Sequence, residues 1–437
     1  MAYERVSFSN WAGNHRSYPL RRHRPRGDRA IANVLAHARD RGETVKVVGA
    51  GHSWSDIACT DGHLISLDED RDIVSVDTRT CTVTARAGIR LRDLSQIVHR
   101  YGLALSNLGS IAEQSVAGAI STGTHGTGLR FGNLATQVIG LRLITGTGDI
   151  LDLDATCEPE LFAAARVGLG CLGIISQVTL QCEPAFNLHE QTRPMAFAEA
   201  FAALPELVAG HEHTKLWWLP HTDVVHVACY DRTDAPVSRT AGLQFKIEHH
   251  RAMTALLGAL IGTGNRLPGT VPYLNRLARP LLLRATDRVN RSDRVFATVM
   301  PSPHLESEYA IPYQHTREAA ERMRALIRAQ ELRVNFIQEL RFVAADDLLM
   351  SPAFGRDSCF FGAYIGACRD RERFFSGFED IMLDLDGRPH WGKIFTVGHA
   401  EFAARLPNFE RFAAIRARLD PNGVFVNPFI RRVFGVA

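Results

Sequence analysis

The stretch "GSIAEQSVAGAISTGTHGTG", residues 109–128, is dominated by glycine and hydroxyl side chains and shows no apolar period. The flanking residues predict a compact α/β unit, in which a loop of this composition is usually functional. A second loop, "GAGHSWSDIACTDG" at 49–62, follows a short β-branched strand predicted at 44–48. Glycine allows a backbone to approach phosphate oxygens closely and to point peptide N–H groups at them, so the two loops together predict a cradle for a diphosphate.

The segments around these loops alternate between helical and strand patterns. Residues 28–43 and 91–102 place apolar side chains on one helical face, and the second of these segments ends at a glycine. Residues 72–88 and 137–154 are typical of β-hairpins. A third glycine-rich stretch, "RVGLGCLGIISQVTL" at 166–180, favours a dinucleotide as the bound anion.

Neither loop has a common phosphate-binding motif. No lysine follows as in GxxxxGK[ST], and GAGHS lacks the third glycine and the following helix of GxGxxG. The cradle is therefore expected to differ from the Rossmann one. The hydroxyls that could donate to the anion are those of Ser53, Ser110, Ser115, Thr122 and Thr124.

Composition narrows the class of protein. The 437 residues, 46% hydrophobic and 22% charged, predict a folded protein of two or three domains. A net charge of +3 does not indicate a nucleic-acid or anionic-membrane partner. The eight cysteines form no CxxC pair and the 18 histidines no HExxH motif, so we expect reduced thiols and no metal site. The longest apolar run, 255–262, is too short to span a membrane, and a soluble cytoplasmic protein without an integral membrane segment is expected.

A second domain is expected after about residue 185, where the segments lengthen and aromatic residues become more frequent. In its predicted strand "VNFIQELRF", alternation places Glu339 and Arg341 on the same face. Taken alone, an acid and a guanidinium so placed could be a surface pair of little energetic value.

Seven motifs, taken in order, resemble the sugar-lactone oxidoreductases of the vanillyl-alcohol oxidase flavoprotein superfamily. The resemblance is to the branch of gulonolactone, galactonolactone and arabinonolactone oxidases and dehydrogenases, with alditol oxidases as more distant relatives. The segment around residues 21–28 and the region from about 233 to 290 carry little of it. The motifs are "VGAGHSWSDIACTDG", "GSIAEQSVAGAISTGTHGTG", "VGLGCLGIISQVTL", "WWLPHTDVV", "EYAIP", "QELRF" and "RPHWGKIFTV".

This resemblance implies an α+β fold of two domains. Residues 1–185 would form an FAD-binding domain of two α/β subdomains, of the vanillyl-alcohol oxidase or PCMH type. Residues 186–437 would form an α+β substrate-binding cap whose C-terminal segment returns to the flavin. His52 matches the histidine that is bonded covalently to the flavin C8 methyl in many members. The residues expected to bind FAD are Gly49, Ala50, Gly51, His52, Ser53, Ser110, Ser115, Gly118, Thr122, Gly123, Thr124, His125, Gly126, Gly173, Ile174 and His390.

The resemblance also assigns catalytic roles. Glu339 and Arg341 match the family pair that faces the substrate over the flavin. Arg341 would stabilise negative charge on the substrate oxygen, and Glu339 would orient Arg341 and bind a substrate hydroxyl. Lys393 matches a lysine beside the flavin and could act as a cation or, if it loses its proton, as a base.

The expected reaction is hydride transfer from a lactone secondary alcohol to flavin, giving an ascorbate-type product. Two alternatives stay open at this point: an alditol oxidase acting on an open-chain polyol, and a flavin-binding protein without catalysis. The substrate would be a small sugar lactone or polyol, and no nucleic acid is expected. The sequence does not choose among oxygen, cytochrome c and a quinone as electron acceptor.

Overall fold

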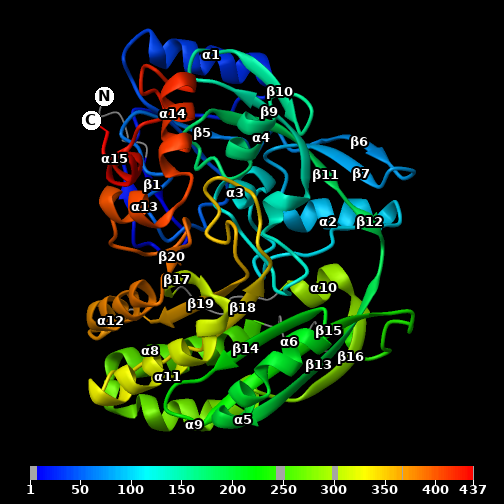
Figure 1. Ribbon diagram of the computed structural model, residues 1–437, viewed down its shortest axis with the longest axis vertical. Helices are drawn as coiled ribbons and strands as arrows, with labels where there is room; N and C mark the ends of the chain where they lie inside the picture. The colour runs from blue at the N-terminus through cyan, green and yellow to red at the C-terminus, as the bar shows by residue number, and fades with distance from the viewer. Residues whose placement is uncertain (1–6, 243–250, 298–303, 367, 437) are drawn as a thin grey trace.

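The structure is a computed structural model that describes residues 7–242, 251–297, 304–366 and 368–436. In Figure 1 the N-terminal part of the chain and the C-terminal helices share one end of the molecule. The middle of the chain, coloured green to orange, forms the other end. A site built from both ends therefore brings together residues that are distant in sequence.

The first unit is a three-stranded parallel sheet in the order β3-β5-β4. Helix α1 (Asp28–Arg39) lies between β3 and β4 in sequence, and it buries Ile31, Leu35 and Ala38 as the apolar period predicts. A short antiparallel pair, β1 with β2, precedes the sheet. The strands are β1 (Phe8–Ser9), β2 (Arg16–Ser17), β3 (Arg21–His23), β4 (Val45–Val48) and β5 (His63–Ser66).

The second unit is a five-stranded antiparallel sheet in the order β10-β9-β11-β7-β6. Both predicted hairpins are confirmed, since β6 pairs with β7 and β9 with β10. The helix predicted at 91–102 is also confirmed as α2. The elements of this unit are β6 (Ile73–Asp77), β7 (Thr82–Arg86), α2 (Leu91–Arg100), β9 (Val138–Ile144), β10 (Ile150–Asp154), α4 (Pro159–Arg166) and β11 (Ile174–Gln181).

The composition of the stretch 109–128 predicted an unbroken loop, and this prediction is wrong. It contains the short helix α3 (Val116–Ser121), capped by Ser115, whose side chain accepts a hydrogen bond of 3.2 Å from the Gly118 N–H. Fewer than two turns are too short for an apolar period to be recognised. Nearby elements are β8 (Leu103–Ala104), η1 (Leu134–Gln137) and β12 (Glu183–Pro184), which pairs with β8.

The other end of the molecule is built on an eight-stranded antiparallel sheet in the order β16-β13-β15-β14-β18-β19-β17-β20. Strands β17 and β18, with β19 between them, carry the acidic and basic side chains described below. The strands are β13 (Asn187–Ala196), β14 (His213–Trp218), β15 (Val224–Thr233), β16 (Thr286–Arg291), β17 (Leu305–Pro312), β18 (Gln338–Val343), β19 (Ser358–Ile365) and β20 (Arg388–Pro389).

Helices lie along this sheet, and Figure 1 shows α5, α8, α9 and α11 at the end of the molecule away from the first two sheets. Within the described ranges, no helix is long and apolar enough to cross a membrane. The helices are α5 (Phe197–Ala202), α6 (Leu204–Gly210), α8 (Arg251–Arg266), η2 (Pro268–Thr270), α9 (Val271–Leu282), α10 (Ser292–Phe296), η3 (Tyr313–His315), α11 (Thr316–Ala329) and α12 (Arg371–Asp384).

The C-terminal segment packs back on the first sheet. The Val45 N–H donates to the Val424 carbonyl over 2.7 Å, and Arg432 forms an ion pair of 2.7 Å with Asp56, which lies within the loop at 49–62. These contacts bring the end of the chain beside the loop at 49–62. The helices of this segment are α13 (His399–Arg405), α14 (Phe409–Leu419) and α15 (Pro428–Phe434).

Candidate functional site

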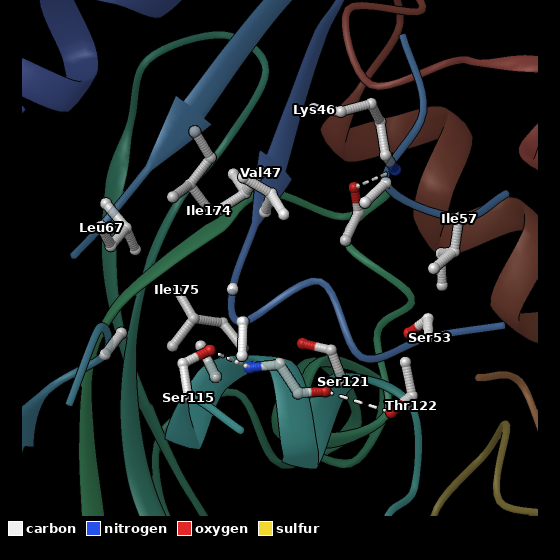
Figure 2. A pocket seen from close by; sticks show the side chains of 18 of the residues that line it. Lys46, Val47, Ser53, Ile57, Leu67, Ser115, Ser121, Thr122, Ile174 and Ile175 are labelled. Carbon is white, nitrogen blue, oxygen red and sulfur yellow. Dashed lines mark hydrogen bonds between the residues drawn. The ribbon is translucent and has the colours of Figure 1, made fainter. Parts of the chain in front are cut away.

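The three glycine-rich stretches meet around one cavity of about 1140 Å³, a volume that includes its open mouth. Figure 2 shows the α3 helix along one side and Leu67, Ile174 and Ile175 along another. A cavity of this size suits a large ligand such as a dinucleotide. The expected cofactor residues that line it are Gly49, Ala50, Gly51, His52, Ser53, Ser115, Gly118, Thr122, Gly173 and Ile174.

Several glycines of this cavity, Gly49 and Gly173 among them, leave no room for a side chain. A Cβ atom at Gly49 would lie 2.3 Å from the Ser115 Oγ, which caps α3. At Gly173, where φ is 157°, a Cβ atom would lie 2.6 Å from the Ile144 carbonyl oxygen. The backbone therefore closes in a way that only glycine allows, as a cradle for an anionic cofactor requires.

His52 stands at the edge of this cradle with one ring nitrogen unused. Its Nδ1 is buried and has no hydrogen-bond partner among the described residues. Burial, together with the charges of Arg90 and Lys393, lowers the pKa of His52 to about 4. The ring is therefore neutral at physiological pH and keeps a free lone pair, which fits a histidine that bonds to FAD.

Lys46 adds a positive charge to the cradle that sequence reasoning missed. It is 2% exposed, lines the cavity and donates to the Gly170 carbonyl over 3.1 Å (Figure 2). Burial lowers its pKa to about 8. The signal was present in the strand "VKVV", in which one lysine interrupts an apolar run.

A smaller, polar pocket of about 450 Å³ adjoins the cradle. His52, Ser53, Gln114 and Thr122 line both spaces, so the two meet at the glycine loops. The polar pocket also contains Arg341 and Lys393, whereas Glu339 lies outside its lining. Of the remaining residues expected to bind the cofactor, Gly123 and Gly126 line neither space. Those that line the polar pocket instead of the cradle are Ser110, Thr124, His125 and His390.

Glu339 holds Arg341 in position. A carboxylate oxygen of Glu339 contacts the Arg341 guanidinium at 2.5 Å and accepts from the Tyr364 hydroxyl at 2.9 Å, while the other accepts from the Trp217 indole at 2.7 Å. Burial opposes ionisation of Glu339, but the charges of Arg341 and Lys215 outweigh it and lower its pKa to about 2. Both oxygens are already engaged, so the structure favours the orienting role expected for Glu339 over binding of a substrate hydroxyl.

Lys393 lies in a turn after β20 and faces two buried glutamates of β17. Its ammonium forms a close ion pair with Glu306 and lies 3.9 Å from Glu308 and 4.2 Å from the centre of the Trp54 ring. The turn is fixed to β17, because the Ile394 N–H donates to the Glu306 carbonyl over 3.0 Å. The lysine is thus 8% exposed and held against acids instead of facing solvent.

The two glutamates have opposite pKa shifts. Burial raises the pKa of Glu306 to about 7, since the nearby Glu308 charge adds to burial and Lys393 offsets only part of it. Burial also disfavours ionisation of Glu308, but Lys393, His125 and His390 together lower its pKa well below the usual range. Close carboxylates seldom ionise together, and here Glu308 stays ionised while Glu306 takes up a proton as the pH falls below about 7.

His125, Glu308 and His390 place ligand-type atoms within 4.8 Å of one another, as a metal site would. Yet the His390 Nδ1 accepts from the Gly392 N–H over 3.1 Å. Burial lowers the pKa of His390 to about 3, so the ring is neutral and its proton sits on Nε2. Neither nitrogen then has a free lone pair for a metal.

The sequence signal for Glu306 and Glu308 was the same alternation that identified Glu339 and Arg341. Residues 305–312 read "LESEYAIP", with two acids on one face of an otherwise apolar strand. That the two pairs converge could not be read from the sequence, because β19 lies between their strands.

Two family models match the chain. The model of an FAD binding domain matches residues 19–154, and the D-arabinono-1,4-lactone oxidase model matches residues 178–433, more than half of the chain. L-gulono-1,4-lactone dehydrogenase of Mycobacterium tuberculosis is 40% identical over 428 residues, which cover 98% of this chain and 99% of that protein. L-gulonolactone oxidase of Bos taurus is 38% identical over 440 residues and covers 99% of each chain.

Among solved structures, a solvent-stable cholesterol oxidase superposes with a TM-score of 0.83 over 99% of this chain and 98% of that one. The sequence identity is 17%, so this likeness concerns the fold alone. It agrees with the α+β architecture expected from the sequence.

Proposed function

We propose that this chain, which belongs to the D-arabinono-1,4-lactone oxidase family, oxidises a secondary alcohol of a sugar-derived aldono-1,4-lactone with FAD. Membership confirms the expected sugar-lactone oxidoreductase branch and the FAD-binding domain. The candidate substrates are gulono-, galactono- and arabinono-lactones. The observation that carries the proposal is the meeting of a glycine-built cradle with a polar pocket that holds Arg341 and Lys393.

The cradle residues would hold FAD, and the bound flavin would supply the acceptor for the hydride from the substrate carbon. Lys46 would offset the negative charge of the cofactor. The unpartnered Nδ1 of His52 supports a covalent bond to the flavin, because a buried neutral imidazole is available for it.

The chain's own residues would handle the substrate oxygen and its proton. Arg341 keeps its charge at every accessible pH and would stabilise negative charge on the substrate oxygen as the C–H bond breaks. Lys393 would contact the same oxygen. We propose that the hydroxyl proton passes to Lys393 while Lys393 gives a proton to the ionised Glu306, so that the lysine stays charged and Glu306 becomes the neutral acid.

The same geometry suggests how the chain is divided. We propose an FAD-binding domain to about residue 185 and a cap from residue 186 onward, with the C-terminal helices returning to the cofactor side. In support, β13 begins the eight-stranded sheet at Asn187, directly after β12. The Arg432 contact with Asp56 belongs to the returning segment.

Two finer points belong to this proposal. The electron acceptor would be oxygen, cytochrome c or a quinone. Comparing peroxide formation in air with cytochrome c or dye reduction under nitrogen distinguishes an oxidase from a dehydrogenase. A cytoplasmic location is supported by the eight free cysteines, five of which are buried as thiols.

The test is a substrate panel on the FAD-loaded protein under nitrogen. Loss of the oxidised flavin absorbance on mixing with gulono-, galactono- or arabinono-lactone, but not with xylitol, is expected. Reduction by xylitol alone would point to an alditol oxidase. A flavin-loaded protein that no lactone or polyol reduces would contradict catalysis altogether.

A further inference from the structure

A second charged groove lies at the end of the molecule away from the cofactor cradle. It runs between α9, α11 and the turn joining β14 to β15, and it has a volume of about 1320 Å³ that includes its open mouth. Figure 1 shows α9 and α11 at this far end. Nothing in the proposed reaction uses the groove. The charged side chains that line it are Asp223, Arg276, Arg279, Arg324, Arg328 and Arg333.

Five arginines therefore line the groove with one acid, and Arg333 also lies 3.9 Å from Glu331, which is outside the lining. Asp223 forms an ion pair with Arg324 and lies 3.4 Å from Arg328. Arg276 and Arg279, both exposed, have no acidic partner in the part of the chain that the structure describes. No aspartate or glutamate occurs from residue 249 to residue 286, although the chain contains 47 of them. The groove is thus strongly positive in a protein whose net charge is only +3.

The framework of the groove is fixed before any ligand arrives. Asn275, which is 5% exposed, donates from its side chain to the Pro220 carbonyl at 2.9 Å and the Val334 carbonyl at 3.0 Å. These bonds tie α9 to both neighbouring segments and set the positions from which Arg276 and Arg279 extend. Such preorganisation reduces the entropy lost on binding.

His221 adds an unused polar group to the same wall. Its Nε2 is buried and has no hydrogen-bond partner among the described residues. Burial and the charges of Arg333 and Arg276 lower the pKa of His221 to about 4, so the ring is neutral. The backbone at this residue is left-handed, with φ at 64°. A neutral imidazole held in this way can donate one hydrogen bond to an anion.

We propose that this groove binds a phosphate group. Guanidinium groups bind phosphate through paired N–H donors, and several can do so at once because a phosphate presents three or four oxygens. A single carboxylate, with two oxygens, could not satisfy Arg276, Arg279 and Arg333 together. The groove would therefore select phosphate esters or free phosphate over carboxylates such as an opened lactone.

The phosphate could come from a dissolved molecule or from a lipid headgroup, and one feature of α9 bears on this choice. Tyr273, Leu277 and Leu281 recur every four residues and are 71%, 71% and 40% exposed. They form an apolar stripe beside Arg276. Exposed apolar side chains next to basic ones are typical of helices that lie on anionic bilayers. The experiment is arranged to separate the two sources.

Binding should be measured with the FAD-loaded protein in phosphate-free buffer. One arm uses equilibrium dialysis with radiolabelled inorganic phosphate and with glycerol phosphate. The other uses co-sedimentation with phosphatidylcholine vesicles with or without phosphatidylglycerol. Binding in either arm identifies the source, and it should weaken about tenfold or more in R276Q/R279Q, the loss expected for two charge-assisted hydrogen bonds.

The matched control is R29Q/R418Q, which removes the same charge from two exposed arginines on α1 and α14. It should bind as the parent does, and both variants should keep the parent rate of lactone oxidation. Equal weakening in both variants would mean unspecific attraction and would overturn the site. So would a parent protein that binds neither the soluble phosphates nor the anionic vesicles.

Discussion

Replacing Glu306 by glutamine should change how stability depends on pH. In the folded protein burial raises the pKa of Glu306 from 4.5 to about 7. Between these two values the folded state holds a proton that the unfolded state has lost, so the free energy of unfolding falls as pH rises. The contribution is complete below about pH 4.5 and lost above about pH 7, and it amounts to about 3 kcal/mol.

The glutamine variant cannot titrate at this position, so this loss should be absent from it. Relative to the parent, E306Q should therefore gain about 3 kcal/mol of stability as the pH is raised from about 5 to about 8. The assay is chemical denaturation of the FAD-loaded protein across this range. The difference between variant and parent at each pH removes the titration of groups that both share.

Glu308 supplies the matched control on the same face of β17. Its pKa is lowered in the folded state, so its ionised form stabilises the protein above its unfolded pKa, and that stability is lost only as the pH falls. E308Q should be less stable than the parent at neutral pH. Because it also removes a charge that helps to raise the pKa of Glu306, its stability should fall less than that of the parent between about pH 5 and 8. If E306Q and the parent instead follow parallel curves, the proton does not reside on Glu306.

Activity gives an independent check of the same residue. If ionised Glu306 takes the proton that Lys393 releases, kcat/KM of the parent should rise with pH and level off above about pH 7, where Glu306 is ionised. E306Q should lose that limb of the profile together with much of the rate. An unchanged limb in E306Q would remove Glu306 from the proton path while leaving the stability result intact.

Substitutions at three further residues test the cofactor and substrate assignments. Arg341→Ala should lower kcat roughly a hundredfold to a thousandfold while flavin absorbance is retained. Arg341→Lys should recover little of this rate, because a lysine lacks the planar guanidinium that Glu339 holds. Near-normal turnover in either variant would remove Arg341 from the mechanism. His52→Ala should release all flavin on acid precipitation, whereas an unchanged acid-stable adduct would identify another anchor. Lys46→Met, made in the His52→Ala background, should weaken FAD retention on dialysis about tenfold. The same change should raise the stability of the apoprotein, because burial has lowered the pKa of Lys46 and a buried charge is costly. Unchanged FAD retention would contradict the role of Lys46 in the cradle.

The two hairpins of the second sheet, strand β4 and helices α1 and α2 were predictable from the sequence, whereas β3 and β5 of the first sheet were not predicted. Hairpins and amphipathic helices carry their own local periods, and the loops at 49–62 and 109–128 were recognisable as one cradle from glycine and hydroxyl content. Lys46 was not found, because a lone lysine in a buried strand gives no sign of which cavity it enters. The α3 helix was too short to show a period.

The eight-stranded sheet was less predictable for a different reason. Strands β18 and β19 are buried at every position, so the alternation that marks a half-exposed strand is lost. Their partners are also remote in sequence, since Glu339 on β18 pairs with Trp217 on β14. Of the residues that line the groove between α9 and α11, Pro272, Arg276 and Arg279 lie in the region that carries little of the family resemblance, and no motif marks the two arginines.

One glycine of β19 lies between the Glu306–Glu308 pair and the Glu339–Arg341 pair. Gly362 of β19 pairs in register with Glu308 of β17 on one side and with Glu339 of β18 on the other. A Cβ atom there would lie 2.7 Å from the Tyr364 ring, so the missing side chain leaves room for that ring to lie across the sheet. The Tyr364 hydroxyl thereby reaches Glu339 at 2.9 Å, while Tyr364 itself pairs in register with Glu306 of β17. Strand β19 thus links the group that orients Arg341 to the group that faces Lys393.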